Sequence, residues 1–468
     1  MTSHRSSDAV GCTPNTNAPT RRDFLKASAI ATFSLSAASY ARVLGSNARL
    51  QVAFIGVGGI AGDQHIPPLE SLGAICPCFT DADSDRWGNC VERWPDAKGY
   101  TDYRKMYDAH MKDIDAVMVG TPDHHHYPAT IIAMMEGKHA YTQKPLTHTP
   151  WEARQLTIAA KKYKVATQMG NQGHASESLR KTIDYLRSGA IGTLKQAHVW
   201  TNRPIWRQGM VVPEGGQPIP ANMDWESWIG PAPMRPYRHD PADGWGGLYH
   251  PFNWRGFYDF GCGALGDMAC HEVDPVYWAM EPGLPTTVEL LKPEPIGDAD
   301  MFKSNGIVRF EFPAKNNRPA FELFWYEGGL KPERPKELEE ETELTDEGAL
   351  YIGEKGKMIA LPNARSEPRL LPQALHDEVG IPPQMIARSE GHHKEWYSAC
   401  VGNKPWDYPK SNFLYAGPFS EAILLGCIAQ KVGGKLEYDG NTQRFTNNDK
   451  ANALIRKSYR KGWDFKMG

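Results

Sequence analysis

The first third of the chain alternates between short, continuously apolar runs and longer segments with helical periodicity. The apolar runs lie at 50–55, 74–80, 115–120, 139–142 and 165–169. The helical patterns between them lie at 84–93, 103–111, 127–137 and 150–163. Continuous apolar runs are typical of strands buried on both faces, and strands that alternate with helices form parallel sheets. The pattern predicts a doubly wound parallel sheet, an α/β domain over residues 48–170.

A different pattern begins at residue 171. Helical periodicity is predicted at 176–188, 263–280, 392–401 and 414–431. Strand-like segments follow at 194–201, 287–291, 306–312, 320–325 and 350–360, the last with a turn at Glu354-Lys355-Gly356. Alternating strands joined by short turns favour an antiparallel sheet. We therefore predict an α+β domain over 171–445, followed by a C-terminal helix and tail over 446–468.

The glycine-rich turn after the first strand has the spacing of a dinucleotide-binding motif. Gly56 and Gly58, followed by Ala61, permit a tight turn, close approach of a pyrophosphate and close helix packing. Asp81 ends the second strand, where a carboxylate binds ribose hydroxyls and repels a 2′-phosphate. The turn therefore predicts NAD, with NADP the less favoured cofactor. The neighbouring residues Gly59 and Ile60 belong to the same predicted site.

Composition limits the classes of partner. The 468-residue chain has a formal net charge of −3 and no basic stripe, so we expect no nucleic-acid partner. Seven cysteines follow residue 41, an odd number without zinc-site spacing, which favours buried free thiols and no metal site.

The first 41 residues have the pattern of a twin-arginine signal peptide. Arg21 and Arg22 precede a short apolar run, 27–38, and Ser39-Tyr40-Ala41 offers a cleavage site. The apolar run is too short to span a bilayer, and no cysteine stands directly after it to carry a lipoprotein anchor. We expect a protein that is periplasmic or otherwise exported by the twin-arginine route, without a stable membrane anchor.

Two further groups of residues can carry chemistry. Lys144 ends a predicted strand on the side of the glycine turn, where an ammonium can stabilise negative charge on a substrate oxygen. Asp267 and His271 are four residues apart on one predicted helix, so they share a face and suit proton transfer. The run His124-His125-His126 points in several directions, which favours packing and hydrogen bonding over metal binding.

These motifs occur in the order found in a known family. The glycine turn, Thr121-Pro122-Asp123-His124-His125-His126, Lys144-Pro145 and Asp267-x-x-x-His271 together resemble the Gfo/Idh/MocA oxidoreductases. The resemblance is to an exported bacterial branch that shares Trp254-Arg255 and the tail Tyr459-Arg460-x-Gly462-Trp463. It implies a Rossmann domain, a second domain with a large, mostly antiparallel open sheet, and a homo-oligomer, a dimer or tetramer, formed through that sheet.

The resemblance also assigns roles to residues. Lys144 would contact the substrate near the nicotinamide, Asp267 and His271 would form the acid–base pair, and His271 would accept the hydroxyl proton. The family's usual glutamate is Gln143 here, which changes the local charge balance. Predicted cofactor residues outside the glycine turn are Asp81, Thr121, Pro122, His126 and Lys144.

The substrate expected from these residues is a sugar, polyol or glycoside. The aromatic stretch 202–260 suits a sugar, because flat rings stack on pyranose faces. The residues expected near the substrate are Lys144, Trp206, Trp245, Tyr249, Trp254, Asp267 and His271, although core packing is the usual fate of tryptophan.

Three functions remain open from the sequence. The first is an NAD(P)-dependent dehydrogenase acting on a secondary hydroxyl, with the nucleotide tightly bound because free NAD is scarce outside the cytoplasm. In its sugar–sugar oxidoreductase form, a second substrate reoxidises the bound cofactor. The second is redox glycoside cleavage by oxidation, elimination, hydration and reduction, with NAD recycled. The third is a non-catalytic nucleotide-binding protein, which the presence of Lys144, Asp267 and His271 disfavours.

Overall fold

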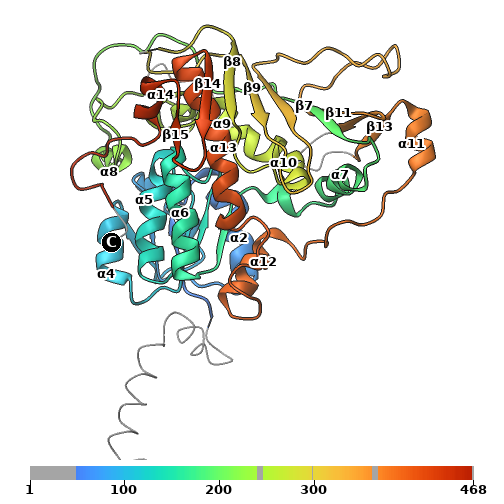
Figure 1. Ribbon diagram of the computed structural model, residues 1–468. Helices are drawn as coiled ribbons and strands as arrows, with labels where there is room; N and C mark the ends of the chain where they lie inside the picture. Colours follow the sequence, from blue (N-terminus) through green and yellow to red (C-terminus); the bar gives the residue numbers. More distant parts are fainter. Residues whose placement is uncertain (1–48, 240–245, 298, 361–366, 466–468) are drawn as a thin grey trace, which may run out of the picture.

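The structure is a computed structural model that describes residues 49–239, 246–297, 299–360 and 367–465. The predicted signal peptide therefore lies outside the described residues. Two β-sheets dominate the described chain, and the helices gather around them and between them (Figure 1).

The first sheet has six parallel strands, and it confirms the predicted doubly wound α/β domain. Its order is β3-β2-β1-β4-β5-β6, in which two halves spread outward from β1 and β4. All six strands are short, and all but the edge strand β3 are largely buried, as expected of strands covered on both faces. The strands are β1 (Val52–Ile55), β2 (Cys78–Thr80), β3 (Lys98–Tyr100), β4 (Ala116–Val119), β5 (His139–Thr142) and β6 (Thr167–Met169).

Helices connect these strands as the periodicity predicts. They are α2 (Ile66–Ser71), α3 (Gly88–Val91), α4 (Tyr103–His110), α5 (His126–Met135) and α6 (Pro150–Tyr163). α6 begins at a capping box in which the Thr149 side chain and Glu152 satisfy each other's backbone N–H groups. Before α2, the turn Ala61–His65 is a π-helix, since Pro67 and Pro68 lack the N–H groups that regular α-helical bonds need.

The second sheet has nine strands and is mostly antiparallel, which confirms the α+β prediction. Its order is β13-β12-β11-β7-β10-β9-β8-β14-β15, and among its paired strands only β7 and β10 run parallel in the described chain. The strands are β7 (Leu194–Trp200), β8 (Thr287–Lys292), β9 (Gly306–Phe312), β10 (Phe321–Glu327), β11 (Gly348–Gly353), β12 (Lys357–Ala360), β13 (Arg369–Leu371), β14 (Lys435–Asp439) and β15 (Arg444–Phe445).

One face of this sheet is covered by helices, among them α7 (Glu177–Ser188) and α13 (Phe413–Val432). α13 packs on α6, on β8 and on β9, so it joins the two sheets (Figure 1). It is long and apolar enough to cross a bilayer by composition, but 83% of its most apolar window is buried inside the protein. Its apolarity is that of a central core helix.

The prediction of a single helix over 263–280 is wrong. The segment forms α9 (Gly263–Glu272) and α10 (Asp274–Met280), with Val273 between them. Pro275 explains the break, because it has no N–H and its ring collides with the carbonyl of the preceding turn.

Two C-terminal segments return to the first sheet. α12 (His392–Cys400) places Trp396 in the apolar cluster of Val52 and Phe54, although the sequence assigns it to the second domain. After α14 (Asp449–Leu454) the tail reaches α4, where Arg104 Nη1 donates to Gly462 O at 3.0 Å. There Trp463 is buried, and the guanidinium carbon of Arg104 lies 3.6 Å from the centre of the Trp463 ring. The short α11 (Gln373–Val379) packs beside β13.

The aromatic stretch folds over the carboxyl ends of the first sheet's strands. It contains α8 (Trp225–Ile229) and a 3₁₀ turn at Asn253–Gly256. Backbone bonds tie it to the loop after β2: Ser84 N donates to Asn222 O (2.9 Å) and Asp224 N to Ala82 O (2.8 Å). The stretch is therefore an ordered cover, which we call the aromatic cover (residues 202–239 and 246–260).

Candidate active site and nucleotide cleft

A cavity of about 380 Å³ lies at the carboxyl ends of β1, β2, β4 and β5, between the first sheet and the aromatic cover. In doubly wound sheets, ligands bind at these strand ends. Most of the residues predicted to bind the cofactor or substrate lie on its wall: Gly56, Gly58, Gly59, Ile60, Asp81, Thr121, Pro122, Lys144, Trp254 and Asp267.

The glycine turn is shaped by two close contacts. Gly56 has φ of +77°, and a Cβ there would lie 2.8 Å from the carbonyl carbon of Gly120 and from Thr121 N. Ala61 is buried behind the cavity wall with its Cβ against Gly120. Larger residues at either position would push the turn away from β4, as the motif predicts.

Asp81 faces the turn as a ribose-binding carboxylate requires. Its Oδ2 accepts the N–H groups of Val57 (2.9 Å) and Gly58 (3.3 Å), and its Oδ1 accepts Asp83 N (3.0 Å). Burial raises the pKa of this carboxyl above its usual range. A carboxylate fixed here favours ribose hydroxyls over a 2′-phosphate.

A basic side chain that the sequence reading missed reaches the same turn. Arg86 lines the cavity and fills the space beside Gly58, so a side chain at position 58 would collide with it. Its Nε donates to Asp83 Oδ2 at 3.2 Å. A guanidinium at a glycine turn is suited to the negative charge of a pyrophosphate.

Asp83 also holds the aromatic cover in place. His250 Nε2 lies 2.9 Å from Asp83 Oδ2, and Asn222 Nδ2 donates to Asp83 Oδ1 at 2.8 Å. Although burial opposes it, the bond with His250 lowers the pKa of Asp83 well below its usual range. His250 lies on the cavity wall, so this contact joins the aromatic cover to the loop after β2 at the edge of the cavity.

The loop after β4 is aligned with the segment that carries Lys144. The two ring nitrogens of His126 lie 2.7 Å from Pro145 O and 2.9 Å from Thr121 O. His126 itself is buried and lies behind the cavity wall, so it positions these two loops. Thr121 Oγ1 is buried and lacks a hydrogen-bond partner among the described residues, which suits a bound polar ligand. The turn, Asp81 and Thr121 thus fit a dinucleotide.

A group of charges lies at the other end of the cavity. Lys144 Nζ is 2.9 Å from Asp267 Oδ1 and donates to Asp267 O at 3.0 Å, and Arg255 Nε is 3.2 Å from the same Oδ1. Although burial opposes it, the two cations lower the pKa of Asp267 to about 2. Arg255 is held between the rings of Phe252 and Trp254, which fixes its orientation.

Asp123 is a second carboxyl on the same wall. It is 2% exposed, and its Oδ2 accepts the N–H of Cys262 at 3.1 Å. Burial and the neighbouring Asp267 raise the pKa of Asp123 to about 7. The sequence reading quoted Asp123 within its motif but gave it no role.

His271 lies one turn after Asp267 on α9, as predicted, but its ring is not on the cavity wall. Its Nδ1 is buried without a hydrogen-bond partner among the described residues. Burial and Lys144 lower the pKa of His271 to about 3. The predicted proton acceptor is thus half-buried beside Lys144 and Asp267.

The predicted aromatic contacts separate into two groups. Trp254 and the additional residue Trp228 line the cavity, whereas Trp206 and Tyr249 are buried away from its wall. Trp206 Nε1 donates to Gln208, and Tyr249 packs within the apolar cluster of the aromatic cover. Trp245 lies outside the described residues.

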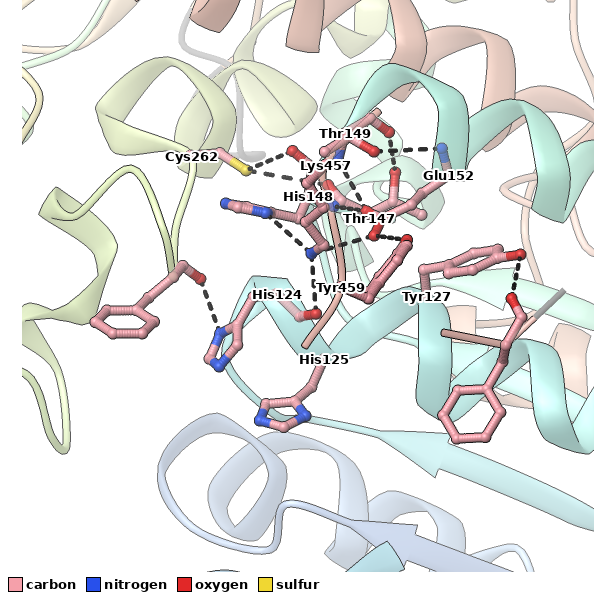
Figure 2. Close-up of polar contacts among 12 residues, drawn as sticks. His124, His125, Tyr127, Thr147, His148, Thr149, Glu152, Cys262, Lys457 and Tyr459 are labelled. Carbon is pink, nitrogen blue, oxygen red and sulfur yellow. Dashed lines mark hydrogen bonds and ion pairs between the residues drawn. The ribbon is translucent and has the colours of Figure 1, made fainter. Parts of the chain in front are cut away.

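The ring nitrogens of the three adjacent histidines lie against backbone carbonyls, the kind of hydrogen bonding that the sequence favours over metal binding, and His125 also lines the cavity. The His124 ring nitrogens approach the carbonyls of Phe260 (3.2 Å) and Trp228 (3.1 Å). Behind them, Lys457 of the tail donates to His124 O at 3.1 Å and pairs with Glu152 at 3.1 Å (Figure 2). No cluster of three metal-ligating side chains occurs in the ranges that the structure describes.

The cysteines also agree with the prediction. All seven described thiols are free and buried: Cys76, Cys78, Cys90, Cys262, Cys270, Cys400 and Cys427.

Comparison with family models identifies both halves of the fold. A model described as an oxidoreductase family with an NAD-binding Rossmann fold matches residues 50–171. The model of the same family's C-terminal alpha/beta domain matches residues 193–301.

Curated relatives match over part of the chain. An alpha-N-acetylgalactosaminidase from Shewanella oneidensis is 32% identical over 156 residues, covering 31% of this chain and 33% of the relative. A levoglucosan dehydrogenase from Pseudarthrobacter phenanthrenivorans is 25% identical over 236 residues, covering 48% and 50%. The chain thus spans between a third and a half of the length of these relatives.

Solved structures share the fold over most of the chain. The WlbA dehydrogenase from Bordetella pertussis, solved with NADH and UDP-GlcNAcA, has a TM-score of 0.54 at 15% identity. The match covers 84% of this chain and 99% of that one.

Replacing Arg86 tests the assignment of the nucleotide end. We expect Arg86→Ala to raise the Kd for NAD about tenfold, because a charge-assisted contact to the pyrophosphate is lost. The measurement is NAD titration calorimetry on stripped protein, with the NAD content after gel filtration as a second readout. Arg93→Ala, which removes a surface partner of Glu70, is the matched control. Equal Kd values for both variants would remove Arg86 from the site.

Proposed function

The chain belongs to the Gfo/Idh/MocA family of oxidoreductases, and from that premise we propose that it oxidises a secondary hydroxyl of a sugar, polyol or glycoside. The observation that carries the proposal is the Lys144–Asp267–Arg255 group, which shares one cavity with the glycine turn. A nucleotide at the turn would bring its nicotinamide toward these charges. A purely nucleotide-binding role would not explain why two partly buried cations are paired with Asp267 on the cavity wall.

NAD is the cofactor that the cleft residues favour. The glycine turn would hold the pyrophosphate, Arg86 would neutralise it, and Asp81 would bind the ribose hydroxyls. When bound, NAD supplies the acceptor for a hydride from the carbinol carbon. The contacts of Asp83 with His250 and Asn222 join the aromatic cover to the loop after β2, which supports a nucleotide that stays bound between turnovers.

The residues of this chain position the substrate and stabilise charge. Lys144 Nζ would donate to the reacting oxygen and stabilise its developing negative charge. Asp267, held ionised by Lys144 and Arg255, would accept a hydrogen bond from a second substrate hydroxyl. Trp254 and Trp228 offer apolar ring faces on the same wall.

Redox glycoside cleavage is the second candidate. The favouring observation is that several relatives are named glycosyl hydrolase family 109 proteins, one of them at 33% identity over 156 residues. A retained nucleotide suits this reaction, because the hydride removed in oxidation returns in the final reduction and no free NAD is consumed.

The two candidates differ in what they release. Purified protein with its bound nucleotide is incubated with methyl and aryl glycosides, without added NAD, and followed by NMR. Free sugar over many turnovers means redox cleavage. An oxidised product that forms only after NAD or an acceptor sugar is added means a dehydrogenase or sugar–sugar oxidoreductase. Neither product, across a panel of sugars and polyols, would contradict the proposal.

Lys144 is the residue whose loss should separate binding from turnover. We expect Lys144→Met to lower kcat at least 100-fold with bound nucleotide retained, because the charge stabilising the substrate oxygen is removed. Lys161→Met on the exposed face of α6 is the control and should turn over normally. Nucleotide absorbance and steady-state rates give the two readouts, and near-normal turnover in Lys144→Met would refute its role.

We also propose a homo-oligomer, a dimer or tetramer, that forms through the open face of the nine-stranded sheet. Apolar side chains at Ile307, Phe324, Ile352 and Ile359 are only half-buried there, on strands whose other face is covered. We expect Phe324→Asp to lower the mass measured by light scattering, while Ile381→Asp, on an isolated residue 91% exposed, leaves it unchanged. A monomeric wild-type protein would contradict this proposal.

Export by the twin-arginine route remains a proposal based on residues 1–41. This route carries folded proteins, which allows a nucleotide to be acquired before export. Replacing Arg21 and Arg22 together by lysine should move the protein from the periplasmic to the cytoplasmic fraction on immunoblots. An unchanged distribution would argue against the signal.

A further inference from the structure

The ion pair between Arg255 and Asp267 uses only part of what each group offers. Arg255 Nε donates to Asp267 Oδ1 at 3.2 Å, and Arg255 Nη1 donates to Phe252 O at 3.1 Å. Among the described residues, Arg255 Nη2 makes no hydrogen bond, and the second carboxylate oxygen of Asp267, Oδ2, receives none. The pair is therefore held through a single bond, and a donor and an acceptor remain available.

Another arginine of this chain shows the complete form of such a pair. Arg154 bonds Glu421 through both Nε and Nη2, one to each carboxylate oxygen. Nε and Nη2 share one edge of the planar guanidinium, so this fork is the common geometry of arginine with a carboxylate. Arg255 presents the same edge to Asp267, which places its Nη2 on the side of the carboxylate. Nη2 and Oδ2 thus belong to adjoining groups of the cavity wall.

The aromatic cover holds the Arg255 guanidinium in this orientation. Its central carbon lies 4.2 Å from the ring centre of Phe252 and 4.3 Å from that of Trp254. The bond from Nη1 to Phe252 O fixes the edge that faces away from Asp267. Only 18% of the side chain is exposed. The open Nη2 is therefore preorganised, so a ligand that binds it does not have to order a mobile side chain.

Lys144 adds a third open group beside these two. Its Nζ is 2.9 Å from Asp267 Oδ1 and donates to Asp267 O at 3.0 Å, which leaves one ammonium N–H without a partner in the described part of the chain. Lys144 and Arg255 both bond the same Oδ1. An oxygen bound to Lys144 and a group bound between Nη2 and Oδ2 would therefore lie on either side of one carboxylate, as hydroxyls on adjacent carbons do.

We propose that Arg255 binds the hydroxyl next to the reacting one and so determines which substrates are oxidised. That hydroxyl accepts a hydrogen bond from Arg255 Nη2 and donates one to Asp267 Oδ2, while the reacting oxygen stays on Lys144. A carbonyl or ether oxygen would leave Oδ2 without a donor, and a carboxylate would meet the negative charge of Asp267. The inference rests on the proposed oxidation and narrows its substrates to vicinal diols, with the aromatic cover supplying the selective residue.

The experiment combines a change in the protein with a change in the substrate. The probes are the methyl glycoside that the wild type oxidises in the product test above and its monodeoxy analogues, each lacking a hydroxyl next to the oxidised carbon. Arg255→Lys keeps a positive charge beside Asp267 but loses the planar fork. Arg235→Lys is the matched control, because Arg235 also belongs to the aromatic cover and bonds Asp259 through Nε and Nη2, but lines a different cavity. The rate of reduction of bound NAD⁺ is measured for each combination, since this step is common to both candidate functions.

In the wild type we expect one analogue to react about 30-fold more slowly than the parent glycoside, because the loss of its hydroxyl leaves Nη2 and Oδ2 unpaired. Arg255→Lys should lose a similar factor with the parent glycoside and then distinguish the parent from that analogue by no more than about 3-fold. Arg235→Lys should discriminate as the wild type does. Such non-additivity between a side chain and a substrate hydroxyl is the signature of a direct contact.

Equal rates for the parent glycoside and all its analogues in the wild type would overturn the inference, whether or not a variant folds. It is also overturned if Arg255→Lys is slower but keeps the wild-type discrimination, which is the result of a role confined to holding Asp267 or the aromatic cover. Nucleotide content and thermal unfolding show that each variant is folded. Failure of the proposed function itself is a different result, namely no reduction of bound NAD⁺ by any sugar, polyol or glycoside in the wild type.

Discussion

One carboxylate joins the parts of this protein that make up its site. Asp267 stands on α9 of the second domain, Lys144 follows β5 of the first, and Arg255 belongs to the aromatic cover. Removing charges from water is costly, so such a group persists only where each member is closely paired. The ion pairs therefore fix the distance between the two sheets at the point where a substrate would lie.

The aromatic cover depends on that same junction. Its tryptophans form a small apolar cluster of their own, which gives a long stretch with little regular structure a reason to stay folded. From this base, Arg255 reaches Asp267 at one end of the cavity and His250 reaches Asp83 at the other. The aromatic cover is therefore attached to the rest of the protein at both ends of the cavity.

The sequence predicts the elements whose cause is local. The apolar runs of β1 and β4, the capping of α6 and the glycine turn all depend on near neighbours, and the structure contains them. The division between α9 and α10 was missed although its cause, Pro275, is local. Other features could not be predicted, because they depend on residues that are distant in the chain. α12 covers Val52 and Phe54 from more than 300 residues away. Arg86 becomes a candidate for the nucleotide site only when the structure places it beside Gly58.

The candidate site residues likewise divide into those that the sequence identifies and those that only the structure identifies. Lys144 and Asp267 are marked by motifs, whereas Arg255 and His250 lie in a stretch without periodicity and Asp123 depends on its surroundings for its properties. Burial and neighbouring charge, rather than residue type, distinguish the two aspartates of the cavity.

The return of the C-terminal segments to the first sheet has a consequence for synthesis of the chain. The six-stranded sheet leaves the ribosome first, yet one of its apolar faces lacks α12, and the pocket for Trp463 beside Tyr103 and His125 lacks its occupant. The nascent sheet thus exposes apolar surface until translation is nearly finished, and such surface is what chaperones bind. It follows also that a premature stop near the end of the message would leave every catalytic side chain in the polypeptide and still yield a protein prone to aggregation.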